Sequence, residues 1–142
     1  MESTHSMELE IITPDASAFK DSVKFVLVRA TDGDFGVLPG HYNTIAALST
    51  WPVKVTRLDG SEYFLAVFGG FMEVTPTKVT ILTSNCELPE VIDVERAKRS
   101  KERAEARLAD KQAHIDVARA EASLRRSLTR LRVSGQIGMD GR

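Results

Sequence analysis

The stretch Val91-Ile92-Asp93-Val94-Glu95-Arg96-Ala97 marks the point where the character of the chain changes. Before it, short β-branched runs alternate with turn residues. After it, glycine and proline are absent until Gly135, and Ala, Arg, Glu and Leu predominate. The first pattern predicts strands and the second predicts helices. Because a helix begins here, the stretch can bind an anion at the helix N-terminus, and it can also act as a hinge between two regions.

Upstream of this junction, residues 1–90 predict a small antiparallel β-sandwich. Residues 23–29 form a strongly β-type run, and Asp59-Gly60 lies between two further runs as a hairpin signal. Gly69-Gly70 predicts a bulge or a sharp bend within the strand region. Many short strands at close spacing are typical of a sandwich.

Downstream, residues 91–134 predict an antiparallel helix pair, with Asp93 and Asp116 as N-caps and residues 110–115 as the turn. The expected apolar stripes contain many small residues: Val94, Ala97, Ala104 and Leu108 on the first helix, and Val117, Ala120, Leu124, Leu128 and Leu131 on the second. Small side chains bury little area, so the hairpin is expected to be weakly held. The Gly-rich residues 135–142 are expected to be a flexible tail.

Composition excludes several classes of protein. The 142 residues are 42% hydrophobic and 27% charged, which is ordinary for a globular protein. No apolar run approaches the roughly 18 residues that span a membrane, and the N-terminus does not resemble a secretory signal, so we expect a cytoplasmic protein. Cys86 is the only cysteine, and we interpret it as a core residue. The sequence contains no phosphate loop, nucleophile elbow or zinc-binding His pair, so no motif predicts an enzyme.

Charge divides unevenly between the two regions. Residues 1–90 contain 6 Lys+Arg and 12 Asp+Glu, whereas residues 91–142 contain 13 Lys+Arg and 8 Asp+Glu. Opposite signs favour docking of the helices on the sandwich, or binding of the basic part to an acidic partner.

Arginines recur with a helical spacing of i, i+7, i+11 in two sets: Arg96, Arg103 and Arg107, then Arg119, Arg126 and Arg130. The members of each set fall within about 40° of one another on a helix. One interpretation is a solvated face, supported by opposite-charge pairs such as Lys101/Glu105. The other is a phosphate site, because guanidinium groups bind phosphate oxygens bidentately. The spacing alone leaves both open.

Three segments resemble the epsilon subunit of bacterial F-type ATP synthase, which corresponds to the mitochondrial delta subunit. Residues 33–41 (GDFGVLPGH) are similar to the family's Gly-x-x-Gly-x-Leu-Pro-Gly-His loop. Residues 68–74 (FGGFMEV), followed by residues 79–82, are similar to its Gly-Gly-Phe-x-Glu-Val strand pair. Residues 92–97 (IDVERA) match the Ile/Leu-Asp-x-x-Arg-Ala motif associated with ATP binding in some bacterial members. The chain departs from the family's pattern after His41, at Tyr42-Asn43-Thr44.

The resemblance implies an α+β chain, with an antiparallel β-sandwich of about ten strands followed by an antiparallel two-helix hairpin. It implies a non-catalytic central-stalk subunit that contacts the gamma subunit and the c-ring. The subunit would be peripheral, on the cytoplasmic face of the cell membrane, with membrane contact only through the complex. The helices would switch between a compact form and an extended form that reaches the alpha/beta catalytic head and inhibits ATP hydrolysis.

ATP, with no requirement for Mg²⁺, is the regulatory ligand that the resemblance implies. Its site would comprise Glu87, Asp93, Arg96, Ala97, Arg103, Arg126 and Arg130, while Pro39, Gly40 and His41 would contact the stalk or c-ring. Arg107 and Arg119 match no family position and keep the solvated-face interpretation. A fixed stalk subunit without nucleotide binding is one alternative. An unrelated sandwich with a basic nucleic-acid-binding arm is another, although the acidic sandwich and the 6% aromatic content argue against a nucleic-acid partner.

Overall fold

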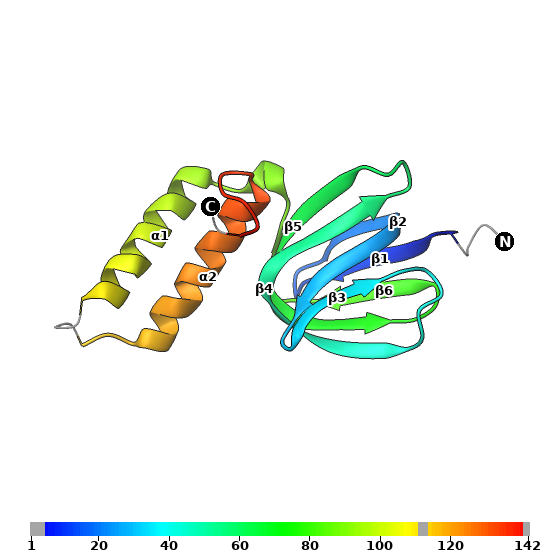
Figure 1. Ribbon diagram of the computed structural model, residues 1–142, viewed down its shortest axis with the longest axis horizontal. Helices are drawn as coiled ribbons and strands as arrows, with labels where there is room; N and C mark the ends of the chain where they lie inside the picture. The colour runs from blue at the N-terminus through cyan, green and yellow to red at the C-terminus, as the bar shows by residue number, and fades with distance from the viewer. Residues whose placement is uncertain (1–4, 111–113, 141–142) are drawn as a thin grey trace.

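The computed structural model describes residues 5–110 and 114–140. Its strands are β1 (Met7–Ile12), β2 (Ser17–Ala30), β3 (Gly33–Val37), β4 (Thr44–Arg57), β5 (Glu62–Val74), β6 (Lys78–Leu82) and β7 (Cys86–Glu87). A short 3₁₀ helix, η2 (Pro89–Val91), leads to α1 (Val94–Ala109) and α2 (Val117–Val133). The two helices lie side by side at one end of the strands, with α2 between α1 and the sheet (Figure 1). The hairpin is therefore in the compact arrangement.

The strands close on themselves. Their order is β1-β6-β5-β4-β2-β3, β7 pairs with β5, and β1 also pairs with β2. The ladders are antiparallel except β1–β6, which is parallel. The predicted class, a β-sandwich followed by helices, is confirmed. The expected count of about ten strands is wrong, since the described residues form seven.

Long continuous strands explain the smaller number. β4 has 14 residues and β5 has 13, and they pair along almost their whole length. The predicted bend lies inside β5, where Gly69 and Gly70 adopt φ values of +77° and +111°. A Cβ on Gly70 would clash with the carbonyl oxygen of Leu82, so only glycine fits there. The glycines bend the strand without ending it, so the residues on both sides of the bend belong to one strand.

The alternating faces of β5 serve two different contacts. Leu65 and Val67 point into the main core of the sandwich and are 0% and 1% exposed. On the other face, Ala66 belongs to a separate small apolar cluster with Ile92 and Val133. This small cluster, with the neighbouring aromatic side chains Phe64 and Phe68, gives the hairpin an apolar contact with the sheet.

Both predicted N-caps are confirmed. The Asp93 carboxylate accepts from the Arg96 amide, and the Asp116 carboxylate accepts from the Arg119 amide, each at 3.1 Å. The predicted turn at 110–115 falls between the helices, but residues 111–113 lie outside the described part of the chain.

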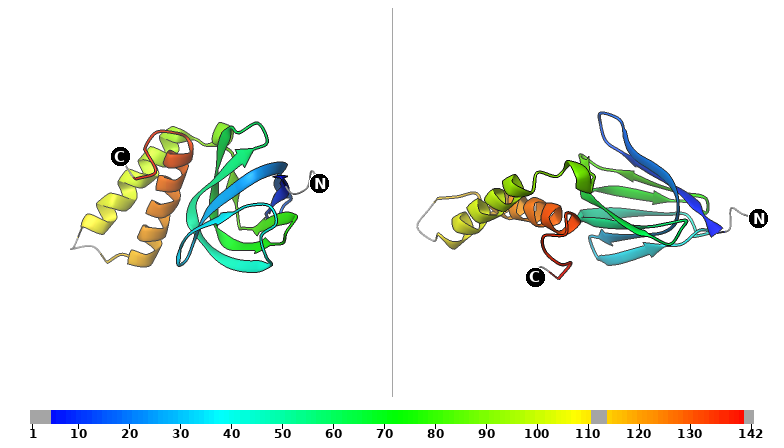
Figure 2. Two further views of the ribbon diagram at one scale, coloured as in Figure 1. Left: turned by 45° about the vertical axis from the view of Figure 1, so that its right-hand side comes forward. Right: turned by 90° about the horizontal axis from the view of Figure 1, so that it is seen from above.

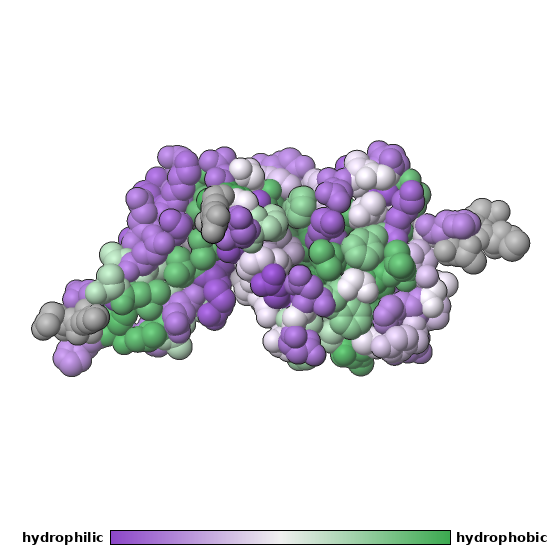
Figure 3. All heavy atoms as spheres, viewed as in Figure 1, coloured by the Kyte–Doolittle hydropathy of each residue, from purple (hydrophilic) through white to green (hydrophobic). Residues whose placement is uncertain are grey.

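Small residues line the seam between the helices, as expected. Ala97, Ala104 and Ala120 are buried. Val117 was expected in this seam but is 52% exposed, because it lies in the first turn of α2. Figure 3 shows hydrophilic side chains along the outer edge of the hairpin and hydrophobic ones gathered at its far end. No helix in the described ranges has the length and apolar character to cross a membrane.

α2 ends in a Schellman motif at Gly135, whose φ is +79°. The Gln136 amide donates to the Leu131 carbonyl at 2.9 Å, and the Gly135 amide donates to the Arg132 carbonyl at 3.1 Å. The chain then turns back on itself as far as residue 140 (Figure 2). The flexibility expected for residues 135–142 stays a prediction, and residues 141–142 lie outside the described ranges.

Candidate functional site

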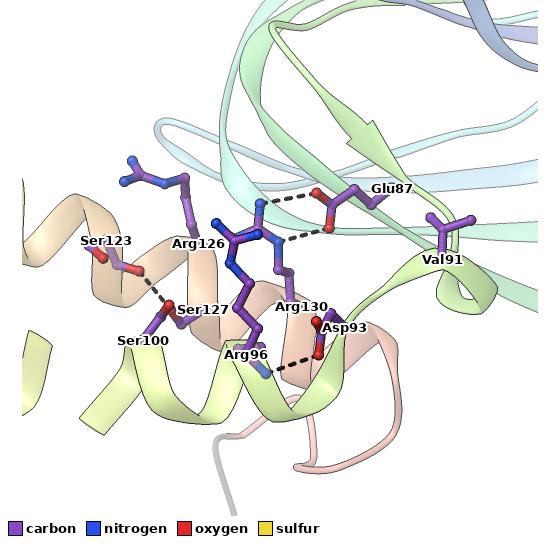
Figure 4. Close-up of a pocket in the computed structure, with 10 residues that line it drawn as sticks. Glu87, Val91, Asp93, Arg96, Ser100, Ser123, Arg126, Ser127 and Arg130 are labelled. Atoms are coloured by element: carbon purple, nitrogen blue, oxygen red, sulfur yellow. Dashed lines mark hydrogen bonds and ion pairs between the residues drawn. The ribbon is translucent and has the colours of Figure 1, made fainter. Parts of the chain in front are cut away.

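A cavity of about 350 Å³ lies where β7, η2, α1 and α2 meet (Figure 4). Its lining residues are Glu87, Val91, Asp93, Arg96, Ala97, Ser100, Ser123, Arg126, Ser127 and Arg130. They come from β7 at the end of the sandwich, η2, the first half of α1, and the middle and second half of α2. This lining therefore exists only while the two helices lie against each other and on the sandwich.

An arginine from α2 holds the sandwich side of this cavity. The Arg130 guanidinium donates bidentately to the Glu87 carboxylate, with Nε–Oε1 at 2.8 Å and Nη2–Oε2 at 3.0 Å. The two side chains are only 28% and 22% exposed. The same guanidinium lies 4.8 Å from the Phe68 ring centroid, which adds a cation–π contact. Arg130 thus attaches α2 to the sheet.

The N-terminus of α1 forms another wall. The Asp93 carboxylate caps the helix and lines the cavity at the same time. Figure 4 shows Arg96 reaching from α1 toward the Arg130–Glu87 pair, and Arg126 extending from α2 away from it. Both arginines are largely exposed, so their charges remain accessible to an anionic ligand. The positive end of the helix dipole adds to their potential.

Six of the seven predicted ATP-site residues line this cavity: Glu87, Asp93, Arg96, Ala97, Arg126 and Arg130. Arg103 does not, and its Nη2 instead donates to the Ser100 hydroxyl at 3.1 Å. Arg96 and Arg103 share a face of α1 but lie at different positions along its axis, because seven residues of α-helix span about 10 Å. Arg107 and Arg119 are exposed and lie outside the cavity lining, in keeping with a solvated face.

The lining residues that the sequence interpretation missed are Val91 and three serines. Ser127 is 1% exposed, and its hydroxyl donates to the Ser123 carbonyl at 3.0 Å. Ser100 lies three residues after Ala97 on the same helix face. A search for small residues at helical spacing, rather than for apolar ones, would have placed all three serines in the seam.

The predicted stalk-contact residues lie elsewhere, in the loop between β3 and β4 at the far end of the sandwich from the helices (Figure 1). The His41 ring stacks on Tyr42 with centroids 4.4 Å apart, and the Gly40 amide donates to the Pro76 carbonyl at 2.8 Å. Exposed apolar side chains flank the loop: Leu38 is 61% exposed, and Tyr42 and Ile45 are each 73% exposed. This surface is separate from the cavity.

Both regions of the chain match models of a single protein family. The family described as ATP synthase, Delta/Epsilon chain, beta-sandwich domain matches residues 6–89. The family described as ATP synthase, Delta/Epsilon chain, long alpha-helix domain matches residues 90–135. The two matches meet at residues 89 and 90, just before the stretch of residues 91–97.

Individual relatives agree. The ATP synthase epsilon chain of Bacillus mycoides (strain KBAB4) is 46% identical over 126 residues, which are 89% of this chain and 94% of the relative. The corresponding chain of Staphylococcus aureus (strain JH9) is 44% identical over 131 residues, 92% and 97% of the two chains. A chain in the structure of Euglena gracilis mitochondrial ATP synthase (OSCP/F1/c-ring in rotational state 1) has a TM-score of 0.75 at 25% identity, over 85% of this chain and 76% of that chain.

These matches confirm the resemblance that the sequence motifs indicated, and they exclude an unrelated sandwich with a basic arm. The chain therefore belongs to the ATP synthase delta/epsilon family, as a central-stalk subunit that is not itself catalytic.

Proposed function

We propose that this central-stalk subunit regulates its complex through ATP bound in the cavity between β7, α1 and α2. ATP holds the hairpin in the compact form. Without ATP the helices extend toward the alpha/beta catalytic head and inhibit ATP hydrolysis. The observation that supports this most is the composition of the cavity, which combines the residue 92–97 motif with arginines from both helices.

The chemistry of the lining suits a nucleoside triphosphate. A volume of about 350 Å³ lies at the lower end of the range for small-molecule sites. Arg96 and Arg126 offer guanidinium groups to phosphate oxygens, and the N-terminus of α1 adds its dipole. Because these groups already supply positive charge, we propose that Mg²⁺ is not required.

ATP would act on the hairpin by linkage. The cavity takes its lining from both helices and the sandwich, so the compact form alone offers the complete site. A ligand at a hundredfold excess over its Kd stabilises the state that binds it by about 2.7 kcal/mol. That amount moves a nearly balanced two-state equilibrium most of the way to one side.

For the rest of the complex, we propose that the sandwich contacts the gamma subunit and the c-ring on the cytoplasmic face of the membrane. The loop at Pro39, Gly40 and His41 would supply part of this contact. Its exposed neighbours Leu38 and Tyr42 offer apolar surface to a partner. The subunit would contact the membrane only through the complex.

Calorimetric titration of the isolated protein with ATP, with and without Mg²⁺, tests the nucleotide site. Arg126→Ala should weaken binding about tenfold or more, since a hydrogen bond to a charged group contributes about 1.5–3 kcal/mol. Arg125→Ala is the matched control, because Arg125 is the exposed neighbour on α2 and does not line the cavity. Absence of ATP binding, or an equal effect of both substitutions, would favour a fixed stalk subunit without a nucleotide site.

A further inference from the structure

The C-terminal end of α2 has a second attachment to the sandwich, outside the nucleotide cavity. The guanidinium carbon of Arg132 lies 4.2 Å from the centroid of the Trp51 ring on β4. The guanidinium carbon of Arg29 on β2 lies 3.8 Å from the same ring. One indole therefore contacts a cation from the helix and a cation from the sheet, and each contact is of cation–π type.

The charges around this stack need compensation. Arg132 is partly buried, and its Nε has no hydrogen-bond partner within the described part of the chain. Burial and the nearby charge of Arg29 lower the pKa of the Arg132 guanidinium, while the carboxylate of Asp140 acts in the opposite direction. Arg29 has its own counter-ion, since its Nε lies 2.7 Å from the Asp34 carboxylate. The Asp140 carboxylate, in the C-terminal segment, therefore offsets part of the cost of placing Arg132 in a partly buried position beside Arg29.

The backbone explains how that segment returns to the stack. The Schellman motif at Gly135 reverses the chain, and the Ile137 amide donates to the Leu131 carbonyl at 3.4 Å. Met139 then helps to line a cleft of about 320 Å³ together with Trp51 and Arg29. The family's helical match ends at residue 135, so this returning segment lies beyond it.

We infer that residues 136–140 form a strap that locks the hairpin onto the sandwich, with Met139 against the Trp51 cleft and Asp140 beside Arg132. The strap shares no lining residue with the nucleotide cavity. It therefore stabilises the compact form without ATP. The strap thus sets the equilibrium between the compact and extended forms that ATP then shifts. This regulatory consequence rests on the proposed function, whereas the structural lock does not.

The geometry of α2 makes the two attachments complementary. Arg130 binds Glu87 in the nucleotide cavity, and Arg132 binds Trp51 outside it. Residues two apart on a helix point in nearly opposite directions, about 160° from each other. A helix held on two sides resists rolling across the sheet, so loss of the strap should loosen the whole last half of α2.

Truncation of the full chain after Gly135 tests the strap, with Arg132→Gln as a second variant. Trp51 is the only tryptophan, so acrylamide quenching of its fluorescence reports exposure of the stack. Hydrogen exchange of α2 amides reports docking independently of any direct effect on the indole. Without ATP, both variants should show stronger quenching and faster exchange in α2. For Arg132→Gln the expected increase in exchange is about threefold to tenfold, the range for loss of a partly desolvated cation–π contact.

Arg119→Gln is the matched control, because it removes an exposed arginine at the other end of α2. Wild-type quenching and exchange in the truncated chain would overturn the strap, whether or not ATP binds. An equal effect of Arg119→Gln would overturn it too, since the cause would then be net charge. Faster exchange in the truncated chain, with no ATP binding by calorimetry, would uphold the strap and contradict only the proposed nucleotide site.

Discussion

Arg130 attaches α2 to the sandwich and also lines the cavity proposed to bind ATP. Its guanidinium is committed to Glu87 by two short hydrogen bonds and to Phe68 by a ring contact. A phosphate group entering the cavity would compete with the Glu87 carboxylate for the same donors. The energetic contribution of Arg130 to nucleotide binding is therefore expected to be smaller than that of Arg126, which extends away from the Arg130–Glu87 pair.

Asp93 caps α1 and also lines the cavity, and substitutions of its carboxylate test the capping role. Asp93→Ala should cost the start of α1 about 1 kcal/mol, because the Arg96 amide loses its acceptor. Asp93→Asn keeps an acceptor oxygen and should keep most of the cap. Hydrogen exchange at residues 95–98 measures the difference, and the same two changes at Asp116 provide the control on α2. Equal exchange in the Asn and Ala variants would contradict a capping role.

Cys86 should be unreactive and should make stability depend on alkaline pH. Burial, with a smaller effect of the Glu87 charge, raises the pKa of its thiol to about 11 from 9.0. A thiol whose pKa is raised by folding contributes stability that is complete below pH 9 and is lost as the pH rises toward 11. Urea midpoints measured between pH 8 and 10 should fall for the wild type and stay flatter for Cys86→Ala.

Above pH 10, the urea midpoints of both the wild type and Cys86→Ala should fall. Burial raises the pKa of Tyr63 to about 12, and its hydroxyl donates to the Glu90 carboxylate. Identical midpoints for wild type and Cys86→Ala from pH 8 to 10 would show that the thiol is not shielded. Slow reaction of the folded wild type with Ellman's reagent at pH 8, compared with the urea-unfolded chain, is the direct check.

Residue roles were predictable where the signal is local. An N-cap depends on one side chain and the helix that follows, so Asp93 and Asp116 could be identified from the sequence. The Glu87–Arg130 pair joins residues 43 positions apart, so no local pattern reveals its geometry. The predicted residues therefore gather around one cavity except for Arg103, because spacing fixes the face of a helix and not the distance to another element.

At the scale of elements, α1 and α2 approach each other closely, but the small residues between them hold the two helices together only weakly. Ala104 of α1 is 1% exposed, and α1 packs on α2 rather than on the sheet. Small residues let the helices approach, but they bury little apolar area. Local opening of the hairpin should thus require less free energy than opening of β4 or β5.

Ala104→Leu tests this packing. The larger side chain has no room in the seam and should cost the hairpin about 1–3 kcal/mol. Ala106→Leu makes the same chemical change on the exposed face of α1 and should cost little. Hydrogen exchange in α1 and α2 distinguishes them. Similar exchange in the two variants would show that the seam is not tightly packed.

The strands show which features of elements the sequence can predict. The bend at Gly69-Gly70 was expected because paired glycines rarely occur inside a flat strand. The sequence did not predict that the bend would leave one strand, because this depends on the pairing of β5 with β4 on both sides of the bend. The parallel β1–β6 ladder was also missed, because it joins residues near opposite ends of the sandwich sequence.

At the scale of the whole molecule, an acidic sandwich holds a basic hairpin through a small apolar cluster and two arginine contacts. A small docking surface is what the proposed switch requires, because one ligand can then change the balance between docked and released forms. The change in composition at residues 91–97 located this boundary. The strength of docking could not be predicted, because it depends on Phe68, Trp51 and the returning C-terminal segment, which only the fold brings near α2.

Hydrogen exchange of α1 and α2 in the isolated full-length protein, with and without saturating ATP, tests the central claim most directly. At about a hundredfold excess over Kd, ATP should slow exchange in both helices together by up to roughly a hundredfold, and it should leave β4 and β5 unchanged. Unchanged exchange in the helices, at an ATP concentration where calorimetry shows the protein to be saturated, would contradict the account.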